Sequence, residues 1–358
     1  MKILVAMSGG VDSSVAAALL LSMGHECVGC TMRLYDNEDA GLSREGACCT
    51  LEDCEDARAV AYKLGMRYFV LNFTAPFREK VMIPFAESYR RAETPNPCVE
   101  CNRALKFDAL RRRAELLGCD AVATGHYARI GFSNGRYVLK KALDETKDQS
   151  YMLYTMSQDE LAHTLFPLGE LEKSRVRRIA EGYGLRNARK PDSQDICFVP
   201  DGDCAGAVER ILNSPNRPGR FVTPEGDVLG QHRGIEHFTL GQRRGFELSL
   251  PQKRYVSAID PESGDVTLAG EEALYSTSAL VRDVNWISGE TPEASFRCTA
   301  RTRYRAPDSP ALATPLGGGM LRLEFDRPQR AITPGQAAVL YDGDTVLGGG
   351  TITKHSGG

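Results

Sequence analysis

The stretch that decides the fold is residues 3–14, which read Ile-Leu-Val-Ala-Met-Ser-Gly-Gly-Val-Asp-Ser-Ser. Its apolar run 3–6 predicts a strand buried on both faces, and the alanine-rich run that follows predicts a helix. The glycine turn between them then lies at a helix N-terminus, where backbone N–H groups face an anion. Gly9 and Gly10 allow a phosphate to approach the backbone closely, and Asp12 can hold Mg²⁺ beside it.

This turn is not a Walker loop, because no lysine follows its glycines. Ser8, Ser13 and Ser14 supply hydroxyl groups instead. A serine-glycine turn can also simply cap an ordinary first βα unit. In this chain, however, the glycine pair, the acid and the hydroxyls coincide at the carboxyl end of the first strand, where open α/β sheets bind ligands. The turn therefore predicts a nucleotide-phosphate site.

The rest of the first half alternates between strand and helix patterns. Strand-like runs lie at 27–32, 68–71 and 121–124. Helices are expected over 50–64, which opens with a capping box between Thr50 and Asp53, and over 171–183. This alternation predicts an α/β fold, a parallel sheet with helices on both faces.

The composition is that of a soluble globular enzyme, and 358 residues suggest two or three domains. Met1 leads straight into the first strand, and no apolar run approaches the about 18 residues of a membrane span, so we expect a cytoplasmic protein without membrane contact. Eleven cysteines, an odd number in a reducing compartment, favour catalytic or metal-directed cysteines over a fixed disulfide framework. The net charge of −3 does not exclude a class of partner. Arginines concentrate positive charge at 111–113, 175–178, 243–244 and 301–305 despite this acidic total.

The second half of the chain has a different character. Near 215–218 the composition shifts toward glycine, proline and short β patterns. Two hairpins are expected, one joining 255–259 to 266–268 and the other joining 338–341 to 345–347. We therefore divide the chain into an α/β domain at 1–205, a central β-rich module at 206–275 and a C-terminal β-barrel at 276–358.

Three cysteines lie where they can carry chemistry. Asn96 is a natural N-cap, and Pro97 a natural first residue, for the helix that follows them. Cys98 and Cys101 then share one face of the first turn, where the helix dipole favours thiolate over thiol. Cys197 is available in a polar loop. A lone Cys-x-x-Cys fits half a zinc site, a redox pair or a pair of cluster ligands, and its spacing does not decide among them.

An ordered series of motifs gives the chain a family resemblance. Ser-Gly-Gly-Val-Asp-Ser at 8–13 is similar to the pyrophosphate loop (PP-loop) of the N-type ATP pyrophosphatases, which split ATP between its α and β phosphates. The motifs together resemble those of the bacterial tRNA-specific 2-thiouridylases, which sulfurate the wobble uridine of certain tRNAs. They are Cys48-Cys-Thr-Leu-Glu-Asp53, Thr94-Pro-Asn-Pro97, Cys101-Asn102, Lys106-Phe107, Ala123-Thr-Gly-His-Tyr127, Lys147-Asp-Gln-Ser-Tyr-Met-Leu153, 192–198, Thr239-Leu-Gly-Gln-Arg-Arg-Gly245, Thr302-Arg-Tyr-Arg305 and Ala331-Ile-Thr-Pro-Gly-Gln336.

The resemblance implies a PP-loop ATP-binding domain and a set of site residues. ATP would be surrounded by Ala6, Met7, Ser8, Gly9, Gly10, Val11, Asp12, Ser13, Met32 and Gly125. The tRNA anticodon loop would be met by Asn96, His126, Lys147, Asp148, Gln149, Arg303, Tyr304 and Gln336. Cys101 would be the nucleophile and Cys197 the persulfide carrier, and the two would form a disulfide that needs reduction. The implied partners are tRNA and a persulfide-donating sulfur-relay protein or cysteine desulfurase, with no DNA and no membrane.

The implied reaction activates the uridine before sulfur enters. The C2 oxygen attacks the α-phosphate of ATP, while the loop amides and Mg²⁺ take up the charge of the departing pyrophosphate. A sulfur nucleophile then attacks C2 and expels AMP. The uridine must leave its stack to reach the site, which an anticodon loop permits at small cost.

Cys98 sets this chain apart, because many family members have aspartate at that position. Cys98, Cys101 and Cys197 supply three thiolates, one short of a closed tetrahedral site, so an iron–sulfur cluster with one open iron is an alternative to the persulfide. In the other interpretation Cys98 merely replaces the aspartate. Two other functions share parts of the pattern: a nitrogen-transferring adenylating synthetase, which has no use for the cysteines, and a non-catalytic tRNA- or metal-binding protein.

Overall fold

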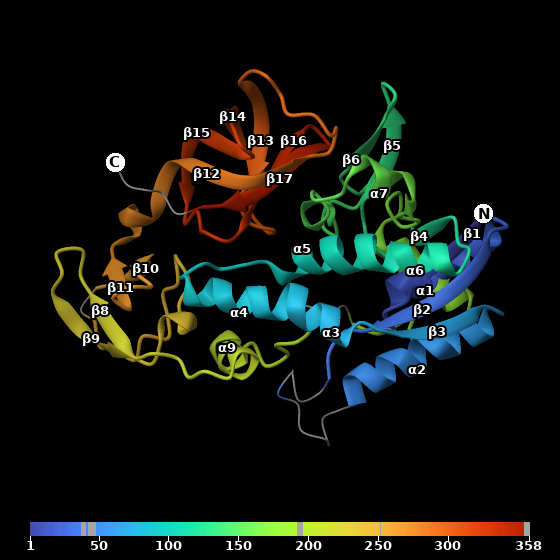
Figure 1. Cartoon of the computed structure of the whole chain (residues 1–358), viewed down its shortest axis with the longest axis horizontal. Coiled ribbons are helices and arrows are strands. Elements are labelled where there is room, and N and C mark those ends of the chain that lie inside the picture. Colours follow the sequence, from blue (N-terminus) through green and yellow to red (C-terminus); the bar gives the residue numbers. More distant parts are fainter. Residues whose placement is uncertain (37–40, 42–47, 192–195, 251, 354–358) are drawn as a thin grey trace.

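The computed structural model describes residues 1–36, 41, 48–191, 196–250 and 252–353, with the backbone alone at 48–51. Figure 1 shows three parts: a parallel sheet with its helices at the right, a small sheet at the left, and a β-barrel above them. Within the described ranges, no helix is both long and apolar enough to cross a membrane.

The first part is built on a five-stranded parallel sheet. In spatial order its strands are β3 (Arg67–Asn72), β2 (Glu26–Arg33), β1 (Lys2–Ala6), β4 (Ala121–Ala123) and β7 (Thr164–Leu165). Ile3, Leu4 and Val5 of the central β1 are fully buried, as expected for a strand covered on both faces. The chain leaves β1 toward β2 on one side and returns to β4 on the other. The strand order therefore reverses between β1 and β4, and ligands bind at the carboxyl ends of strands at such a point.

Helices cover both faces of this sheet. One face carries α1 (Val11–Ser22), α2 (Cys48–Lys63) and α8 (Lys173–Gly182), and the other carries α3 (Thr74–Phe77), α4 (Ile83–Arg90), α6 (Leu110–Leu116) and α9 (Cys204–Leu212). Ile3 and Val5 contact the first group and Leu4 the second, because successive side chains of a strand alternate between its faces. Both helices expected from the sequence are confirmed, but the side chain of Thr50, and with it the capping box, lies outside the described side chains.

The helix predicted to begin after Asn96 changes character after its first turn. α5 spans Pro97–Cys101, the π-helical η3 spans Asn102–Ala109, and α6 completes the run. A second π-helical segment, η2 (Arg78–Met82), precedes α4. π-helical turns are rare and often mark functional sites, and η3 begins directly after a cysteine. The 3.6-residue periodicity that predicts one continuous helix does not reveal this widening.

The second and third parts are β structures. The small sheet has the order β10 (Tyr255–Ile259), β11 (Asp265–Ala269), β8 (Gly219–Val222) and β9 (Val228–His232). The barrel has the order β12 (Tyr275–Trp286), β15 (Met320–Arg330), β14 (Ser309–Gly317), β13 (Phe296–Arg301), β16 (Ala337–Asp342) and β17 (Thr345–Ile352), and β12 pairs with β17 to close it. The two predicted hairpins are β10–β11 and β16–β17. These parts confirm the predicted fold class; the domain boundaries stay a prediction.

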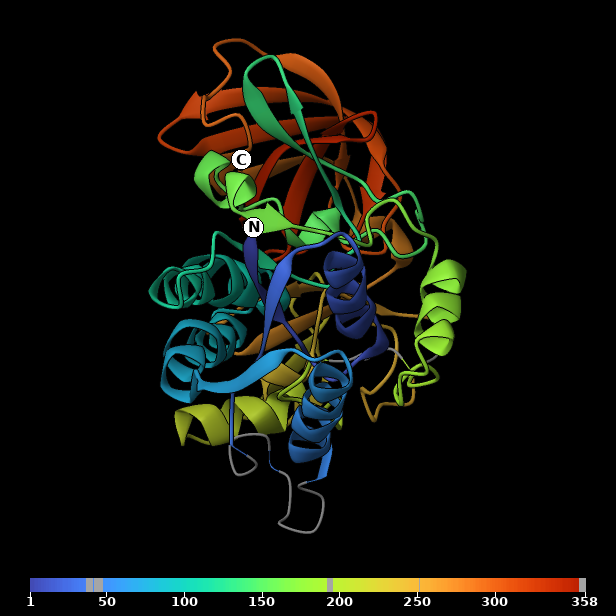
Figure 2. The same ribbon diagram turned by 90° about the vertical axis from the view of Figure 1, so that its right-hand side faces the viewer.

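One hairpin of the first half joins the barrel. β5 (Arg129–Ser133) and β6 (Arg136–Lys140) follow β4, and Lys140 pairs with Thr345 of β17. Figure 2 shows this hairpin standing against the barrel strands. The Arg129 guanidinium, 2.8 Å from the Asp344 carboxylate, adds an ion pair to the joint. The short η4 (Ser150–Met152) and α7 (Gln158–Ala162) then lead back to the parallel sheet.

Candidate functional site

The loop after β1 has the backbone of a phosphate site. Gly9 has φ +78°, and a Cβ at this position would lie 2.4 Å from the backbone oxygen of Asp53, so only glycine fits. Gly10 is the N-cap of α1 and offers no side chain to bond the first amides of the helix. The helix N-terminus is therefore left uncapped by a side chain at the edge where ligands bind.

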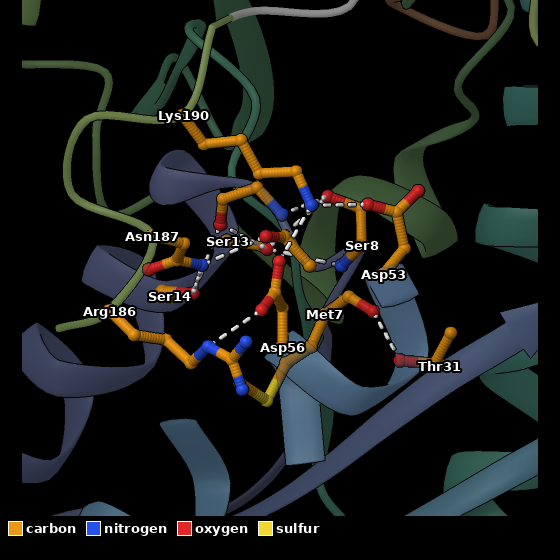
Figure 3. Close-up of polar contacts among 12 residues, drawn as sticks. Met7, Ser8, Ser13, Ser14, Thr31, Asp53, Asp56, Arg186, Asn187 and Lys190 are labelled. Carbon is orange, nitrogen blue, oxygen red and sulfur yellow. Dashed lines mark hydrogen bonds and ion pairs between the residues drawn. The ribbon is translucent and has the colours of Figure 1, made fainter. Parts of the chain in front are cut away.

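Hydroxyl and amide groups hold this loop in shape. Ser13 Oγ accepts from the Ser8 N–H at 3.1 Å and donates to the Gly10 carbonyl at 3.2 Å. Ser14 Oγ also donates to Gly10, at 3.0 Å, and accepts from Asn187 Nδ2 at 2.9 Å (Figure 3). Asn187 Nδ2 donates to the Gly9 carbonyl as well, at 2.9 Å. Ser14 is fully buried, so its hydroxyl supports the loop.

The carboxylate of Asp12 has cationic and hydroxyl partners. Lys173 Nζ lies 2.7 Å from Oδ2 and 2.8 Å from Oδ1, and the Tyr127 hydroxyl donates to Oδ1 at 2.8 Å. The Lys173 side chain is 10% exposed and that of Asp12 29% exposed. Both carboxylate oxygens of Asp12 therefore accept from protein donors in this arrangement. Sequence reasoning missed Lys173, because a lysine opening a helix far along the chain carries no local signal.

A second group of charges lies beside Gly9. Lys190 Nζ lies 2.6 Å from Asp53 Oδ1 and 2.7 Å from Asp56 Oδ2, and Arg186 Nε lies 2.9 Å from Asp56 Oδ1. Figure 3 shows Lys190 reaching from its segment toward Asp53 and Asp56. Burial works to lower the pKa of Lys190, but its bonds to the two carboxylates outweigh burial and raise that pKa. Lys190 is thereby bonded to two carboxylates of α2, and the backbone of Asp53 in that helix lies against Gly9.

The other residues predicted to surround ATP lie at the same edge of the sheet. Met32 is on β2 and Gly125 follows β4, and β1 lies between these two strands. A Cβ at Gly125 would lie 2.6 Å from the Ser13 backbone N, so the loop after β4 lies against the first turn of α1. Met7 is buried and its carbonyl accepts from Thr31 Oγ1 at 2.6 Å. The run from Ala6 to Ser13 includes Val11, which is buried in the core. Met32 lies near the carboxyl end of β2, the neighbouring strand.

The cysteine helix begins as expected. The Asn96 side chain accepts from the backbone N–H of Cys98 at 3.1 Å, and Pro97 takes the first helical position. Cys101 is buried, whereas Cys98 and Cys197 are exposed, and all three are free thiols. Tyr35 fixes the Cys197 backbone by donating its hydroxyl to the carbonyl oxygen at 2.6 Å. We call Cys98, Cys101 and Cys197 the cysteine cluster.

The thiols of the cysteine cluster influence one another. The surrounding protein raises the pKa of the Cys197 thiol to about 12, and the nearby thiols of Cys101 and Cys98 add to this rise. Desolvation by neighbouring protein atoms likewise raises the pKa of Cys98 and that of the buried Cys101. Lys106 opposes the rise at all three. Desolvation by the surrounding protein thus opposes the expected thiolate. The effect of the helix dipole on these thiols stays a prediction.

The cysteine cluster does not form a metal site in this arrangement. Among the residues that the structure describes, no three His, Cys, Asp or Glu side chains are grouped so that they could hold a metal ion. That result concerns a single metal ion. In an iron–sulfur cluster the thiolates bind different irons, so the cluster stays an alternative to the persulfide.

Most of the residues expected to meet tRNA lie where the first part meets the barrel. The Tyr304 hydroxyl donates to the Asp148 carbonyl at 3.2 Å, and Arg301 Nη1 lies 3.6 Å from the Asp148 carboxylate. Gln149 accepts from the Tyr127 N–H at 3.0 Å, and Asn96 Nδ2 lies 3.2 Å from Met152 Sδ. Lys147 precedes these residues and is half-buried. The structure thus brings distant motifs to one junction.

His126, Arg303 and Gln336 have protein partners in this state. His126 Nδ1 lies 2.6 Å from Thr124 Oγ1; burial, assisted by Lys106, lowers the His126 pKa well below its ordinary value, so the ring is neutral. Arg303 Nη2 donates to the carbonyls of Leu240 and Ala331, both at 3.1 Å, while its buried Nε has no hydrogen-bond partner in the described part of the chain. Gln336 Nε2 donates to the Thr94 carbonyl at 2.7 Å.

Comparison with known proteins gives matches along the whole chain. Family models described as tRNA methyl transferase HUP domain, tRNA methyl transferase PRC-barrel domain and Aminomethyltransferase beta-barrel domain match residues 1–201, 208–270 and 276–352. A relative from Moorella thermoacetica named tRNA-specific 2-thiouridylase MnmA is 50% identical over 352 residues, which cover 98% of each chain. A relative of the same name from Symbiobacterium thermophilum is 47% identical and covers 99% of this chain and 92% of its own. A solved 4-thiouridine synthetase–RNA complex with bound ATP is similar at a TM-score of 0.38 and 15% identity over 59% of this chain and 50% of its own.

Proposed function

The chain belongs to the tRNA-specific 2-thiouridylase family, and we propose that it uses ATP to replace the C2 oxygen of a tRNA wobble uridine by sulfur. The observation that carries the proposal is 50% identity over 98% of both chains, joined to a phosphate loop and a cysteine cluster in one domain. Membership of this family argues against a nitrogen-transferring synthetase and against a non-catalytic binding protein.

ATP would bind where the loop after β1 meets the loop after β4. Gly9 lets the loop lie against the Asp53 backbone, Gly10 leaves the first amides of α1 without a side-chain cap, and Gly125 lets the two loops touch. ATP supplies an adenylyl group that turns the uridine oxygen into part of a leaving group. The amides at the start of α1 would stabilise the charge that develops on pyrophosphate. Mg²⁺ is expected with the phosphates, and Asp12 would hold it there by sharing its carboxylate with Lys173 and Tyr127.

The sulfur steps would use Cys197 and Cys101 in turn. The terminal sulfur of a Cys197 persulfide attacks C2, AMP leaves, and a C2–S–S–Cys197 intermediate forms. The Cys101 thiolate then attacks the Cys197 sulfur, which releases 2-thiouridine and leaves a Cys101–Cys197 disulfide. An external dithiol must supply two electrons to restore the thiols. Cys98 takes no step in this scheme and occupies the position of the aspartate.

The partners follow from the chemistry. A persulfide-donating protein, either a sulfur-relay protein or a cysteine desulfurase, would load Cys197, whose exposed surface permits transfer from another protein. The tRNA would lie across the junction of the first part and the barrel, where the expected contact residues gather. We place the reaction in the cytoplasm, where reductants can reopen the disulfide.

The proposal is tested by chemistry on the purified protein and by tRNA from cells. With tRNA, ATP and a low-molecular-weight persulfide, oxygen-free protein is expected to release AMP and form 2-thiouridine, measured by mass spectrometry of nucleosides. Cells lacking the gene are expected to lose wobble 2-thiouridine. An unchanged 2-thiouridine content in those cells contradicts the proposed function.

Iron and sulfide analysis of the same preparation separates the two sulfur routes. An iron-free preparation that forms 2-thiouridine supports the persulfide. Activity that requires iron and disappears in Cys98→Asp supports the cluster instead.

A further inference from the structure

The segment before the cysteine helix is held by the barrel. Thr94 stands two residues before the N-cap Asn96. Its N–H donates to the Pro334 carbonyl at 2.8 Å, and its carbonyl accepts from Gln336 Nε2 at 2.7 Å. Both backbone polar groups of Thr94 are thus bonded to one barrel loop, residues 333–336.

Gly335 shows how closely the two segments fit. It has φ +88°, and a Cβ at this position would lie 2.8 Å from the Thr94 backbone N and 2.9 Å from the Glu93 Cβ. The loop is itself anchored to β17, because Gly335 donates to the Ile352 carbonyl at 2.9 Å and Gln336 accepts from the Ile352 N–H at 2.8 Å. Thr94 is therefore bonded to a loop whose residues Gly335 and Gln336 are both hydrogen-bonded to β17 of the barrel.

The central module reaches the same point. The hydroxyls of Thr94 and Thr239 are 3.4 Å apart. Arg303 bonds the Leu240 and Ala331 carbonyls and also the Thr333 hydroxyl. All three parts of the molecule therefore meet at Thr94, directly before the residues that carry the thiols.

The segment from Thr94 to Cys98 is stiff enough to pass on a displacement. Thr94-Pro-Asn-Pro97 contains two prolines, each of which fixes its own φ and restricts the residue before it. Asn96 then bonds the Cys98 N–H through Oδ1 and contacts Met152 through Nδ2. A shift of Thr94 is carried into the first turn of α5 because few torsions in between are free to absorb it.

We propose that Gln336 is a positioning residue for sulfur transfer, which sets the helix of Cys98 and Cys101 relative to the barrel by holding Thr94. The proposal rests on the proposed function. It gives Gln336 a role in the free protein, in contrast to its expected role as a tRNA contact. A tRNA seated on the barrel would have its uridine aligned with the thiols through this bond, and small misplacements at a reacting center cost large factors in rate.

Hydrogen exchange of the free, full-length protein gives the first test. In Gln336→Ala the amides of residues 92–101 are expected to exchange about two- to tenfold faster, as expected for loss of one net hydrogen bond. Gln329→Ala is the matched control, because the Gln329 side chain bonds Ser309 and the Arg327 carbonyl within the barrel. Unchanged exchange in Gln336→Ala overturns the proposal. If Gln336→Ala folds poorly, Gln336→Glu can be used instead, because it keeps the shape of the side chain and removes the Nε2 donor to the Thr94 carbonyl. The same faster exchange of residues 92–101 is expected.

Kinetics with tRNA, ATP and a low-molecular-weight persulfide give the second test. At saturating tRNA, the kcat for 2-thiouridine formation is expected to fall about tenfold or more in Gln336→Ala, with a much smaller change in the rate of AMP release. A raised KM with unchanged hydrogen exchange would instead make Gln336 a tRNA contact only. If the wild type forms neither AMP nor 2-thiouridine, the proposed function is contradicted. The hydrogen-exchange result then still decides whether Gln336 positions the cysteine helix.

Discussion

The phosphate loop and the cysteine cluster lie in the same domain, but the fold prepares them for chemistry in opposite ways. Ser13, Ser14 and Asn187 hold the loop in a fixed shape before any ligand arrives. At the cysteines, the surrounding protein raises the pKa of every thiol, and Lys106 only partly opposes it. The loop is thus held in shape in the free protein, whereas the surroundings of the free thiols favour their protonated form.

The largest effect is expected from substitution of Cys197, which should stop sulfur transfer at the cysteine cluster without stopping adenylation at the phosphate loop. Cys197→Ser removes the proposed sulfur carrier, so 2-thiouridine formation is expected to fall by about a thousandfold or more, while AMP release stays near the wild-type rate. Both products can be followed by mass spectrometry in one reaction. Cys204→Ser, a half-buried cysteine at the start of α9, is the control and is expected to keep both activities. Normal thiolation by Cys197→Ser contradicts the assignment.

The ion pair behind the phosphate loop tests how firmly that region is fixed. Lys173→Met leaves Asp12 without its cation, so the free energy of unfolding in urea is expected to fall by about 1–3 kcal/mol, the lower values reflecting the partial exposure of Asp12. The double variant Asp12→Asn/Lys173→Met is expected to regain more than half of the loss. Additive losses in the double variant show that the two side chains do not stabilise each other.

Alanine substitution of Gly9, with Gly24 as its control, tests whether ATP binding depends on the shape of the loop after β1. Gly9→Ala is expected to weaken ATP binding about tenfold or more, because its Cβ would lie 2.4 Å from the Asp53 backbone oxygen. Gly24 has a similar φ of +83° with nothing within 4 Å, so Gly24→Ala carries the same backbone cost without the clash. Calorimetric titration with a non-hydrolysed ATP analogue measures both. Equal affinities of the two variants for that analogue refute a role for the close approach at Gly9.

The smallest expected effect concerns the protonation of the thiols. Burial raises the pKa of Cys101 above the ordinary 9.0, so the folded protein holds this proton more tightly than the unfolded chain does. The resulting stability is complete below pH 9 and is lost as the pH rises through the higher pKa of the folded state. Alkylation of Cys101 by iodoacetamide, followed by peptide mass spectrometry, is accordingly expected to keep accelerating above pH 9.

Lys106 should modulate this protonation. Lys106→Met removes the charge that lowers the thiol pKa, so alkylation at pH 8 is expected to slow about two- to fivefold. Lys80→Met, an exposed lysine of the other π-helical segment, is expected to change nothing. Faster alkylation in Lys106→Met contradicts the electrostatic role.

Local chemistry explains what the sequence could predict. The β1–α1 turn, the Asn96 cap and the two hairpins depend on neighbouring residues, and each is confirmed. Lys173 and Asn187 reach the loop from more than 150 positions away, so no local pattern points to them. Desolvation of the thiols by the surrounding protein is a tertiary property, so the sequence pattern of a cysteine in a first helical turn does not reveal it. Roles of Arg303 and Gln336 toward tRNA stay predictions, since both side chains bond protein groups in this state.

The hairpin that joins the barrel also constrains the order in which the chain can assemble. Lys140 pairs with Thr345, so the hairpin leaves the ribosome about 200 residues before the strand it will extend. At synthesis rates of about 5–20 residues per second, β6 waits on the order of ten to forty seconds with one edge unpaired. Arg136, Lys140 and Lys141 place positive charges along or directly after that edge, which is how exposed strands discourage unwanted pairing. The nascent chain thus carries its own protection against aggregation until β17 has been synthesised.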